Sequence, residues 1–185
     1  MADKSENRRR HIVDTSRMLI LRHGLRGTTM EALAREAEVA KATLYAYFQD
    51  KDAVFAAVVD TLVDELNAAF EVSMASGGDL PERIGRALGS QFNVLANALA
   101  GSPYATELMS EHRRAGLQLR EREHLTERLI TEALDQAGAN DAQLLSHIII
   151  SSAYGIALKT NEPDRRADAI MLVCRRVLAP ALNKG

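Results

Sequence analysis

Apolar residues recur three or four positions apart along most of this chain, and no stretch alternates apolar with polar residues. Spacing of this kind places the apolar side chains on one face of an α-helix. Ile12, Ser16, Leu19, Ile20 and His23 mark one such face. The spacing predicts long helices at roughly 7–23, 51–75, 81–99, 141–159 and 163–182. It also predicts two short helices between residues 29 and 48, and a short helix near 103–111 followed by a long one that ends at about 137. We therefore expect an all-α chain of about nine helices.

Proline and glycine stand where these helices are expected to begin and end. Pro81, Pro103 and Pro163 each have an acidic or small polar residue close by, as in the first turn of a helix. Gly24, Gly77–Gly78, Gly101 and Gly138 stand where periodic segments stop, as helix-ending glycines do. No Asn-Gly or Asp-Gly pair, which would favour a β-hairpin, occurs in the sequence.

The two short helices between Thr29 and Phe48 are separated by only three or four residues. Thr28 and Glu31 have the spacing of a capping box, which favours a helix start at this point. Leu44 and Phe48 lie one turn apart on the inner face of the second helix. Two short helices joined by a tight turn form a helix-turn-helix, whose second helix can enter the major groove of DNA.

The outer face of that second helix has side chains suited to DNA. Lys41 can hydrogen-bond to guanine, and Ala42 and Thr43 can contact the methyl group of thymine. The hydroxyls of Tyr45 and Tyr47 can reach phosphates or bases, or their rings can simply pack with the polar tips in water. Lys51 begins the next helix, where the backbone amides and the helix dipole also favour a phosphate.

Charge is unevenly distributed over the 185 residues, although the formal net charge is only −2. Residues 1–26 contain seven Lys or Arg and three Asp or Glu, whereas residues 56–185 contain 13 basic and 17 acidic residues. A basic segment joined to an acidic body is typical of a nucleic-acid module with a second domain, and equally of a solvated arm.

Composition and motifs exclude several other classes of protein. The hydrophobic content of 46% suffices for a core, no apolar run is long enough for a membrane span, and no secretory signal is expected. A single cysteine, Cys174, excludes an internal disulfide and favours the cytoplasm. The five histidines form no His-x3-His pair, and no Gly-rich phosphate loop or Gly-x-Ser-x-Gly motif is present. We expect no catalytic residues, cofactor or metal, so a helical enzyme is disfavoured.

Residues 8–55 also contain a specific motif, a Thr-Leu-Tyr-x-Tyr-Phe-x-x-Lys run with Thr-Thr at a fixed distance upstream. Its matching residues are Gly27, Thr28, Thr29, Leu33, Ala34, Ala37, Val39, Lys41, Thr43, Leu44, Tyr45, Tyr47, Phe48, Lys51 and Asp52. This segment closely resembles the DNA-binding domain of the TetR family of transcriptional regulators. The resemblance implies a helix-turn-helix domain over 1–50 and a helical regulatory and dimerisation domain over 51–185.

The resemblance implies two sets of DNA contacts, one that sets the register on the backbone and one that reads the sequence. Phosphate contacts are implied for Thr28 or Thr29, Tyr47 and Lys51. Contacts with bases or the backbone beside them are implied for Lys41, Ala42, Thr43 and Tyr45.

Three residues depart from the usual pattern of the family. Glu38 stands where the turn usually has Gly, so a positive φ there would be strained. Ala40 replaces the usual Ser or Thr cap, and Ala42 stands where Gly is common. These departures bear on the turn geometry and the operator preference.

The resemblance further implies a homodimer through the last two helices and a small-molecule pocket in the C-terminal domain. Small residues of the helix at 141–159 permit close helix approach, although both helices are equally compatible with the core of a monomer. Pocket candidates combine apolar walls with a few polar groups. They are Phe92, Leu95, Tyr104, Met109, His112, Leu125, Ile149 and Tyr154, with Asn93 or Asn97 as polar anchors. The same apolar stripes are also compatible with an ordinary core.

The function predicted from these features is sequence-specific binding of double-stranded operator DNA. The expected mode is a cytoplasmic repressor that is released by a small apolar or amphipathic ligand. The alternative is a DNA-binding regulator without such an inducer, which a protein partner controls or which acts as an activator.

Overall fold

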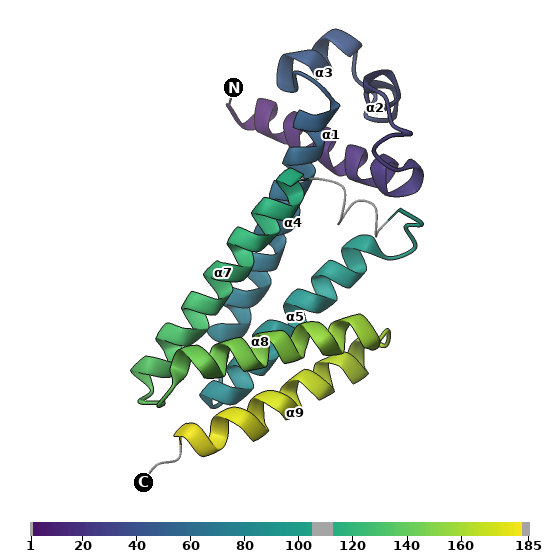
Figure 1. The fold of residues 1–185 in the computed structure, drawn as a ribbon. Coiled ribbons are helices and arrows are strands. Elements are labelled where there is room, and N and C mark those ends of the chain that lie inside the picture. The colour runs from purple at the N-terminus through teal and green to yellow at the C-terminus, as the bar shows by residue number, and fades with distance from the viewer. Residues whose placement is uncertain (1, 105–112, 183–185) are drawn as a thin grey trace. The chain divides into compact units, whose positions relative to one another are not determined.

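The computed structural model describes residues 2–104 and 113–182, and these ranges contain eight helices and no strand. The helices are α1 (Ala2–His23), α2 (Met30–Glu36), α3 (Lys41–Tyr47), α4 (Lys51–Met74), α5 (Leu80–Leu99), α7 (Arg113–Gln136), α8 (Ala142–Lys159) and α9 (Pro163–Leu182) (Figure 1). The predicted all-α fold is confirmed. The short helix expected near 103–111 lies largely outside the described residues.

Most helix ends fall within a few residues of the predicted ones, and α1 is the exception. It begins at Ala2 instead of residue 7, so the predicted start was wrong. Residues 2–6 contain no Pro or Gly to stop a helix and no apolar periodicity to reveal one. Lys4, Ser5 and Glu6 in this added segment are exposed.

Side-chain caps begin several helices where the sequence places an acid before the apolar run. Oδ1 of Asp50 accepts a hydrogen bond from the Ala53 amide at 2.8 Å, and Oδ1 of Asp79 accepts one from the Glu82 amide at 2.8 Å. Each cap satisfies an amide that has no partner inside its helix. α4 and α5 therefore start at positions that the local sequence specifies.

The chain forms two compact units, and the first combines residues 1–63 with 99–119. Its core lies where the first four helices meet, and Ile12, Leu33, Leu44 and Val54 are at most 1% exposed. The predicted domain boundary at residue 50 falls inside this unit, because the first part of α4 contributes Val54 and its neighbours to the same core.

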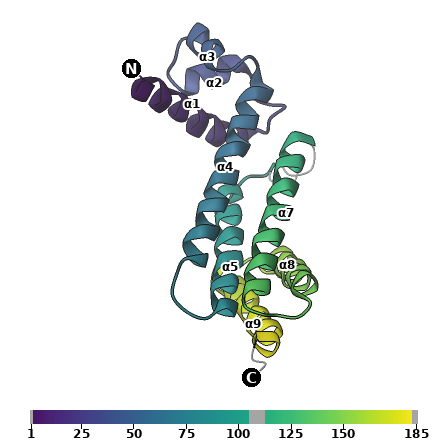
Figure 2. The same ribbon diagram turned by 90° about the vertical axis from the view of Figure 1, so that its left-hand side faces the viewer.

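The second unit combines residues 64–98 with 120–185. α8 and α9 lie side by side in both views, next to α5 and α7 (Figures 1 and 2). Ile84, Ile130, Ile149 and Ile170 form the centre of the core, each at most 1% exposed. Burial also raises the pKa of the Cys174 thiol to about 12, which fits the prediction that this cysteine is a small apolar core residue.

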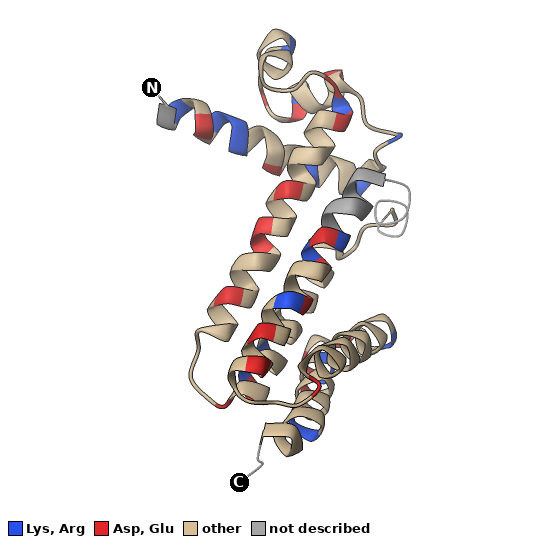
Figure 3. Ribbon diagram, turned by 60° about the vertical axis from the view of Figure 1, so that its left-hand side comes forward, with Lys and Arg blue, Asp and Glu red and all other residues tan. Residues whose placement is uncertain are grey.

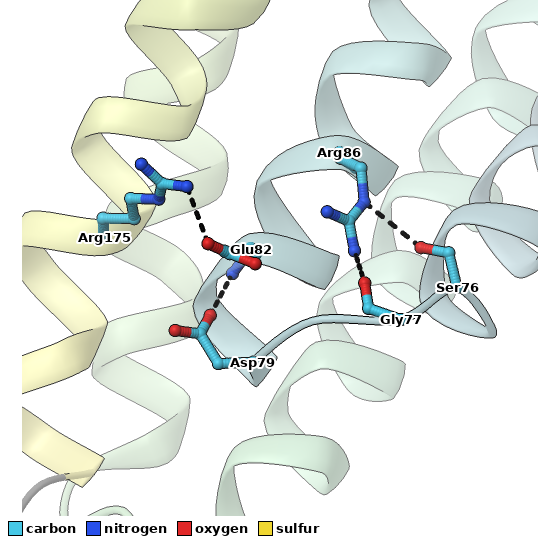
Figure 4. Close-up of polar contacts among 6 residues, drawn as sticks. All are labelled: Ser76, Gly77, Asp79, Glu82, Arg86 and Arg175. Carbon is cyan, nitrogen blue, oxygen red and sulfur yellow. Dashed lines mark hydrogen bonds and ion pairs between the residues drawn. The ribbon is translucent and has the colours of Figure 1, made fainter.

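A polar cluster fixes the connection between α4 and α5 (Figure 4). Arg86 donates from Nε to Oγ of Ser76 at 3.1 Å and from Nη2 to the carbonyl of Gly77. Glu82, in the first turn of α5, pairs with Arg175 of α9 at 2.7 Å. These contacts join the two ends of the loop and tie α5 to α9 within the second unit.

Candidate nucleic-acid interface

α2 and α3 form a helix-turn-helix of two seven-residue helices joined by residues 37–40. Leu33 and Leu44 hold the two helices onto the core of the first unit, with 1% and 0% exposure. Two backbone bonds close the turn, from the Glu38 amide to the Arg35 carbonyl at 3.2 Å and from the Val39 amide to the Ala34 carbonyl at 3.0 Å. This geometry leaves the opposite face of α3 free of its own unit's core.

The turn has the backbone conformation that the sequence comparison with the family suggested. Glu38 has φ of +52°, in the left-handed region where Gly is preferred, and its side chain is exposed. Ala40 is the N-cap of α3 and supplies no side-chain hydrogen bond. Glu38 is therefore a strained position, and Ala40 leaves α3 without a side-chain cap.

The first turn of α2 is capped by Thr29, one residue later than the capping box predicts. Oγ1 of Thr29 accepts a hydrogen bond from the Ala32 amide at 3.1 Å. Thr28 is only 1% exposed, and its hydroxyl donates to the carbonyl of Gly24 at 2.7 Å. The Thr28 hydroxyl is therefore buried and already bonded within the protein. Thr29 remains as the exposed candidate.

The remaining predicted contact residues of α3 lie on its outward or lateral faces. Lys41, Ala42 and Tyr45 are exposed, and the Tyr45 side chain is 45% exposed. Thr43 and Tyr47 are half-buried. Tyr47 also packs against the core of the first unit, and its hydroxyl lies 3.2 Å from Oγ of Ser5. The packing interpretation therefore applies in part to Tyr47 and not to Tyr45.

Lys41 is paired with a carboxylate on the neighbouring helix. Its ammonium donates to Oε1 of Glu31 and lies 5.9 Å from the centre of the Tyr45 ring. The hydrogen bond and charge of Lys41 lower the pKa of Glu31, and the same bond and charge of Glu31 raise the pKa of Lys41. The cation expected to read bases is therefore held by an acid of the same unit.

Lys51 has a structural role that the sequence did not reveal. Its ammonium donates to the carbonyl of Leu25 at 3.0 Å and points at the carbonyl of Thr28 at 3.4 Å. These carbonyls belong to the loop between α1 and α2, 26 and 23 residues earlier in the chain. The side chain thus fastens this loop to the start of α4, where a phosphate contact was expected.

Basic residues of α1 extend the surface beyond the helix-turn-helix, as the blue segments of that helix show (Figure 3). The guanidinium of Arg9 lies 5.3 Å from the centre of the Phe48 ring, just after α3. Arg8 and Arg10 on either side of it are exposed. These residues were not predicted as site residues, and the run of three arginines was the only signal for them.

The described pocket candidates differ in burial and are divided between the two units. The Phe92 and Tyr154 rings meet edge to face, with centroids 5.0 Å apart, and Leu125 is 36% exposed. Ile149 belongs to the buried core of the second unit at 1% exposure, and Leu95 is half-buried. Tyr104 belongs to the first unit, where it packs against that core. Met109 and His112 lie outside the described residues.

Two features of the second unit were not predicted from the sequence. Arg122 on α7 is only 9% exposed, and burial lowers its pKa. An open groove of about 380 Å³ also lies on α7 and the start of α8. It is lined by His124, Glu127, Arg128, Thr131, Glu132 and Gln143. Its lining is charged and polar, and none of the predicted pocket residues belongs to it.

Other kinds of site have little support in the part of the chain that the structure describes. None of its helices has the length and apolar character that crossing a membrane requires. Within the same residues, no three His, Cys, Asp or Glu side chains come together in a group that could hold a metal ion.

Residues 12–58 match the family described as bacterial regulatory proteins, tetR family. A curated relative, the uncharacterized HTH-type transcriptional regulator YhgD of Bacillus subtilis (strain 168), is 29% identical over 84 residues. That match spans 45% of this chain and 44% of the relative, so the chain matches less than half the length of this curated protein.

Solved structures extend the likeness over nearly the whole chain. A putative TetR-family transcriptional regulator from Mesorhizobium loti MAFF303099 superposes with a TM-score of 0.73 at 16% identity, covering 95% of this chain and 97% of that one. A putative TetR-family transcriptional regulator from Rhodococcus sp. superposes with a TM-score of 0.72 at 19% identity, covering 93% of this chain and 99% of that one. Identities this low show the common fold. Residues 12–58 thus match the TetR family of transcriptional regulators, and the all-helical fold is the one seen in solved structures of such regulators.

Proposed function

We propose that the chain binds a specific operator by inserting α3 into the major groove of DNA. The observation that carries this proposal is the orientation of α3, whose Leu44 is buried while Lys41, Ala42 and Tyr45 are exposed. The exposed residues can reach base edges, and Thr29 and the arginines of α1 can contact the backbone on either side. Thr43 and Tyr47 stand at the edges of the same face.

The operator is proposed to be an inverted repeat bound by a homodimer. One helix-turn-helix reads one half-site, so a long specific site requires two copies. Support comes from α8 and α9, which carry large apolar side chains that are exposed in the single chain. They are Leu144, Ile148 and Leu158 on α8, and Leu172 on α9. Burying these residues against a second copy would form a four-helix interface through the last two helices.

Regulation is proposed to be repression that a small molecule relieves by binding in the second unit. The aromatic pair of Phe92 and Tyr154 supports a ligand in this unit, because it combines an apolar wall with a phenolic hydroxyl. Control by a protein partner, or activation, is the alternative, and the burial of Ile149 in a packed core favours it. Release requires that the ligand bind the two states of the protein with different affinity.

The test of DNA binding is operator selection from random duplexes, followed by affinity measurements at several salt concentrations. We expect the affinity to fall steeply with salt, because basic residues release counterions from the phosphates. Arg10→Ala on α1 is expected to weaken binding to every sequence alike, and Lys159→Ala on α8 serves as the control that also removes one positive charge. Affinity that is independent of salt, with no selected sequence, would contradict the proposal.

A further inference from the structure

Two of the three guanidinium nitrogens of Arg122 on α7 are buried without a hydrogen-bonding partner among the described residues. The residue is 9% exposed, and its Nε and Nη2 atoms have no partner within the described part of the chain. Because arginine does not lose its proton in proteins, the site holds a full positive charge away from water. A buried charge of this kind is costly unless an anion pairs with it.

The same unit contains a second buried arginine, which shows what a structural arginine looks like in this fold. Arg166 is 4% exposed, and its donors are taken up by neutral oxygens. They reach the carbonyls of Thr160 at 3.1 Å and Asn161 at 3.1 Å, and Oδ1 of Asn93 at 3.0 Å. Arg166 thus ties the α8–α9 turn to α5. Arg122 makes no comparable set of bonds among the described residues.

The two unpartnered nitrogens of Arg122, Nε and Nη2, are the pair through which arginine binds a carboxylate. Nε and Nη2 lie on the same edge of the guanidinium plane, and their two N–H groups point in parallel toward one side. A carboxylate fits such an edge with two parallel hydrogen bonds, one to each oxygen. One positive charge is balanced by one carboxylate, so the edge suits a monoanion.

The neighbouring side chains supply an apolar wall and a further donor. Burial, more than the nearby charge of Glu123, raises the pKa of Tyr154, while the charge of Arg122 acts in the opposite direction. The phenol therefore stays protonated at neutral pH and can donate a hydrogen bond. Its ring meets Phe92 edge to face at 5.0 Å, and 36% of Tyr154 remains exposed, so the cluster reaches solvent.

We propose that the second unit binds an organic monocarboxylate with an apolar body, whose carboxylate pairs with Nε and Nη2 of Arg122 and whose body lies against Phe92 and Tyr154. The proposal rests on the ligand-controlled regulator proposed above and gives that ligand its chemical class. The ligand supplies the hydrogen-bonded carboxylate that no described residue supplies to Nε and Nη2, although the charge of Glu123 also acts on Arg122.

The first experiment measures thermal unfolding of the full-length protein without DNA at constant ionic strength. The probes are octanoate and benzoate, each compared with its neutral analogue, 1-octanol and benzyl alcohol. The variants are Arg122→Met and, as the control, Arg120→Met, which removes an exposed charge from the same helix. We expect at least one carboxylate to raise the Tm of the wild type more than its alcohol does. Arg120→Met is expected to keep this difference and Arg122→Met to lose it.

Two outcomes overturn the proposal. One is that neither carboxylate raises the Tm of the wild type more than its alcohol does. The other is that a carboxylate still raises the Tm of Arg122→Met more than its alcohol does. The Tm without probe provides a second readout. Removing an unpaired buried charge is expected to leave the Tm unchanged or raise it, whereas losing a structural partner lowers it. A clear drop in the Tm of Arg122→Met alone would therefore show a structural arginine.

The second experiment separates this proposal from the proposed function. The selected operator is titrated with each protein in the presence and absence of the stabilising carboxylate. We expect that carboxylate to weaken operator binding by the wild type about tenfold and binding by Arg122→Met hardly at all. If the wild type binds no operator, the proposed function fails while the thermal result still decides the ligand class. If the carboxylate binds but leaves operator affinity unchanged, ligand-controlled release fails.

Discussion

At the scale of single residues, the pair of Glu31 and Lys41 links the free protein to DNA binding. Lys41 can approach a base only if its ammonium leaves the Glu31 carboxylate, or if both move together toward the negatively charged duplex. The lowered pKa of Glu31 keeps that carboxylate ionised even in mildly acidic solution. The acid therefore opposes binding in two ways, by holding the lysine and by repelling phosphate.

Glu31→Gln is predicted to bind the selected operator several-fold more tightly than the wild type, because it frees Lys41 and removes a negative charge. The matched control is Glu36→Gln, which removes a charge from the same short helix without releasing Lys41. Binding constants from electrophoretic shifts at two salt concentrations check the prediction. Equal gains in both variants would show that general charge, and not release of Lys41, is responsible.

Glu38 provides a prediction on stability. Its φ of +52° costs about 1 kcal/mol for a residue with a Cβ, so Glu38→Gly is predicted to raise the free energy of unfolding by up to that amount. Glu36→Gly, in the last turn of α2, is the control and is predicted to lower it by about 1 kcal/mol. Urea denaturation measures both. A Glu38→Gly variant less stable than the wild type would be inconsistent with the strained turn.

The predictability of the site also differs between residues. Burial of Leu44 and exposure of Lys41 follow from their positions on one short helix, so periodicity sufficed. Thr28 and Thr29 are adjacent and chemically alike, and only the exact start of α2 separates the buried one from the cap. The carbonyl partners of Lys51 are more than 20 residues away in sequence, and tertiary packing alone brings them together.

At the scale of elements, α8 combines a buried face with an exposed apolar one. Ile149 and Ala153 are 1% exposed, whereas Leu144 and Leu158 are 58% and 84% exposed. Apolar residues on all sides gave a clear prediction of a helix but not of which side faces the core. For the same reason, the sequence did not distinguish between a dimer interface and a monomer core for the last two helices.

Leu158→Glu is predicted to convert the proposed homodimer to a monomer, because it places a charge in the apolar contact between two copies of α8 and α9. Val72→Glu on α4 is the control, since Val72 is also highly exposed at 72%. Light scattering coupled to gel filtration gives the mass of each. A wild type that is monomeric at micromolar concentration, or a Leu158→Glu variant that stays dimeric, would refute this interface.

At the scale of the whole molecule, the sequence predicted the order of the eight described helices because most have an apolar face and are bounded by capping residues, prolines or glycines. It could not predict that the first part of α4 packs in the core of the first unit. Nor could it predict Arg122, whose burial depends on the packing of distant helices. Local sequence features determined where the helices lie, and tertiary packing determined which polar and charged side chains are buried.

The central claim is that α3 reads DNA in two symmetry-related copies, and one measurement tests it most directly. Selection of bound duplexes from a random pool is performed with the wild type and with Thr43→Ala, a change at the edge of the exposed face of α3. The account predicts an inverted repeat for the wild type, and for the variant a changed preference at the same position of both half-sites. Identical selected sequences for the two proteins, or a site without two-fold symmetry, would contradict it.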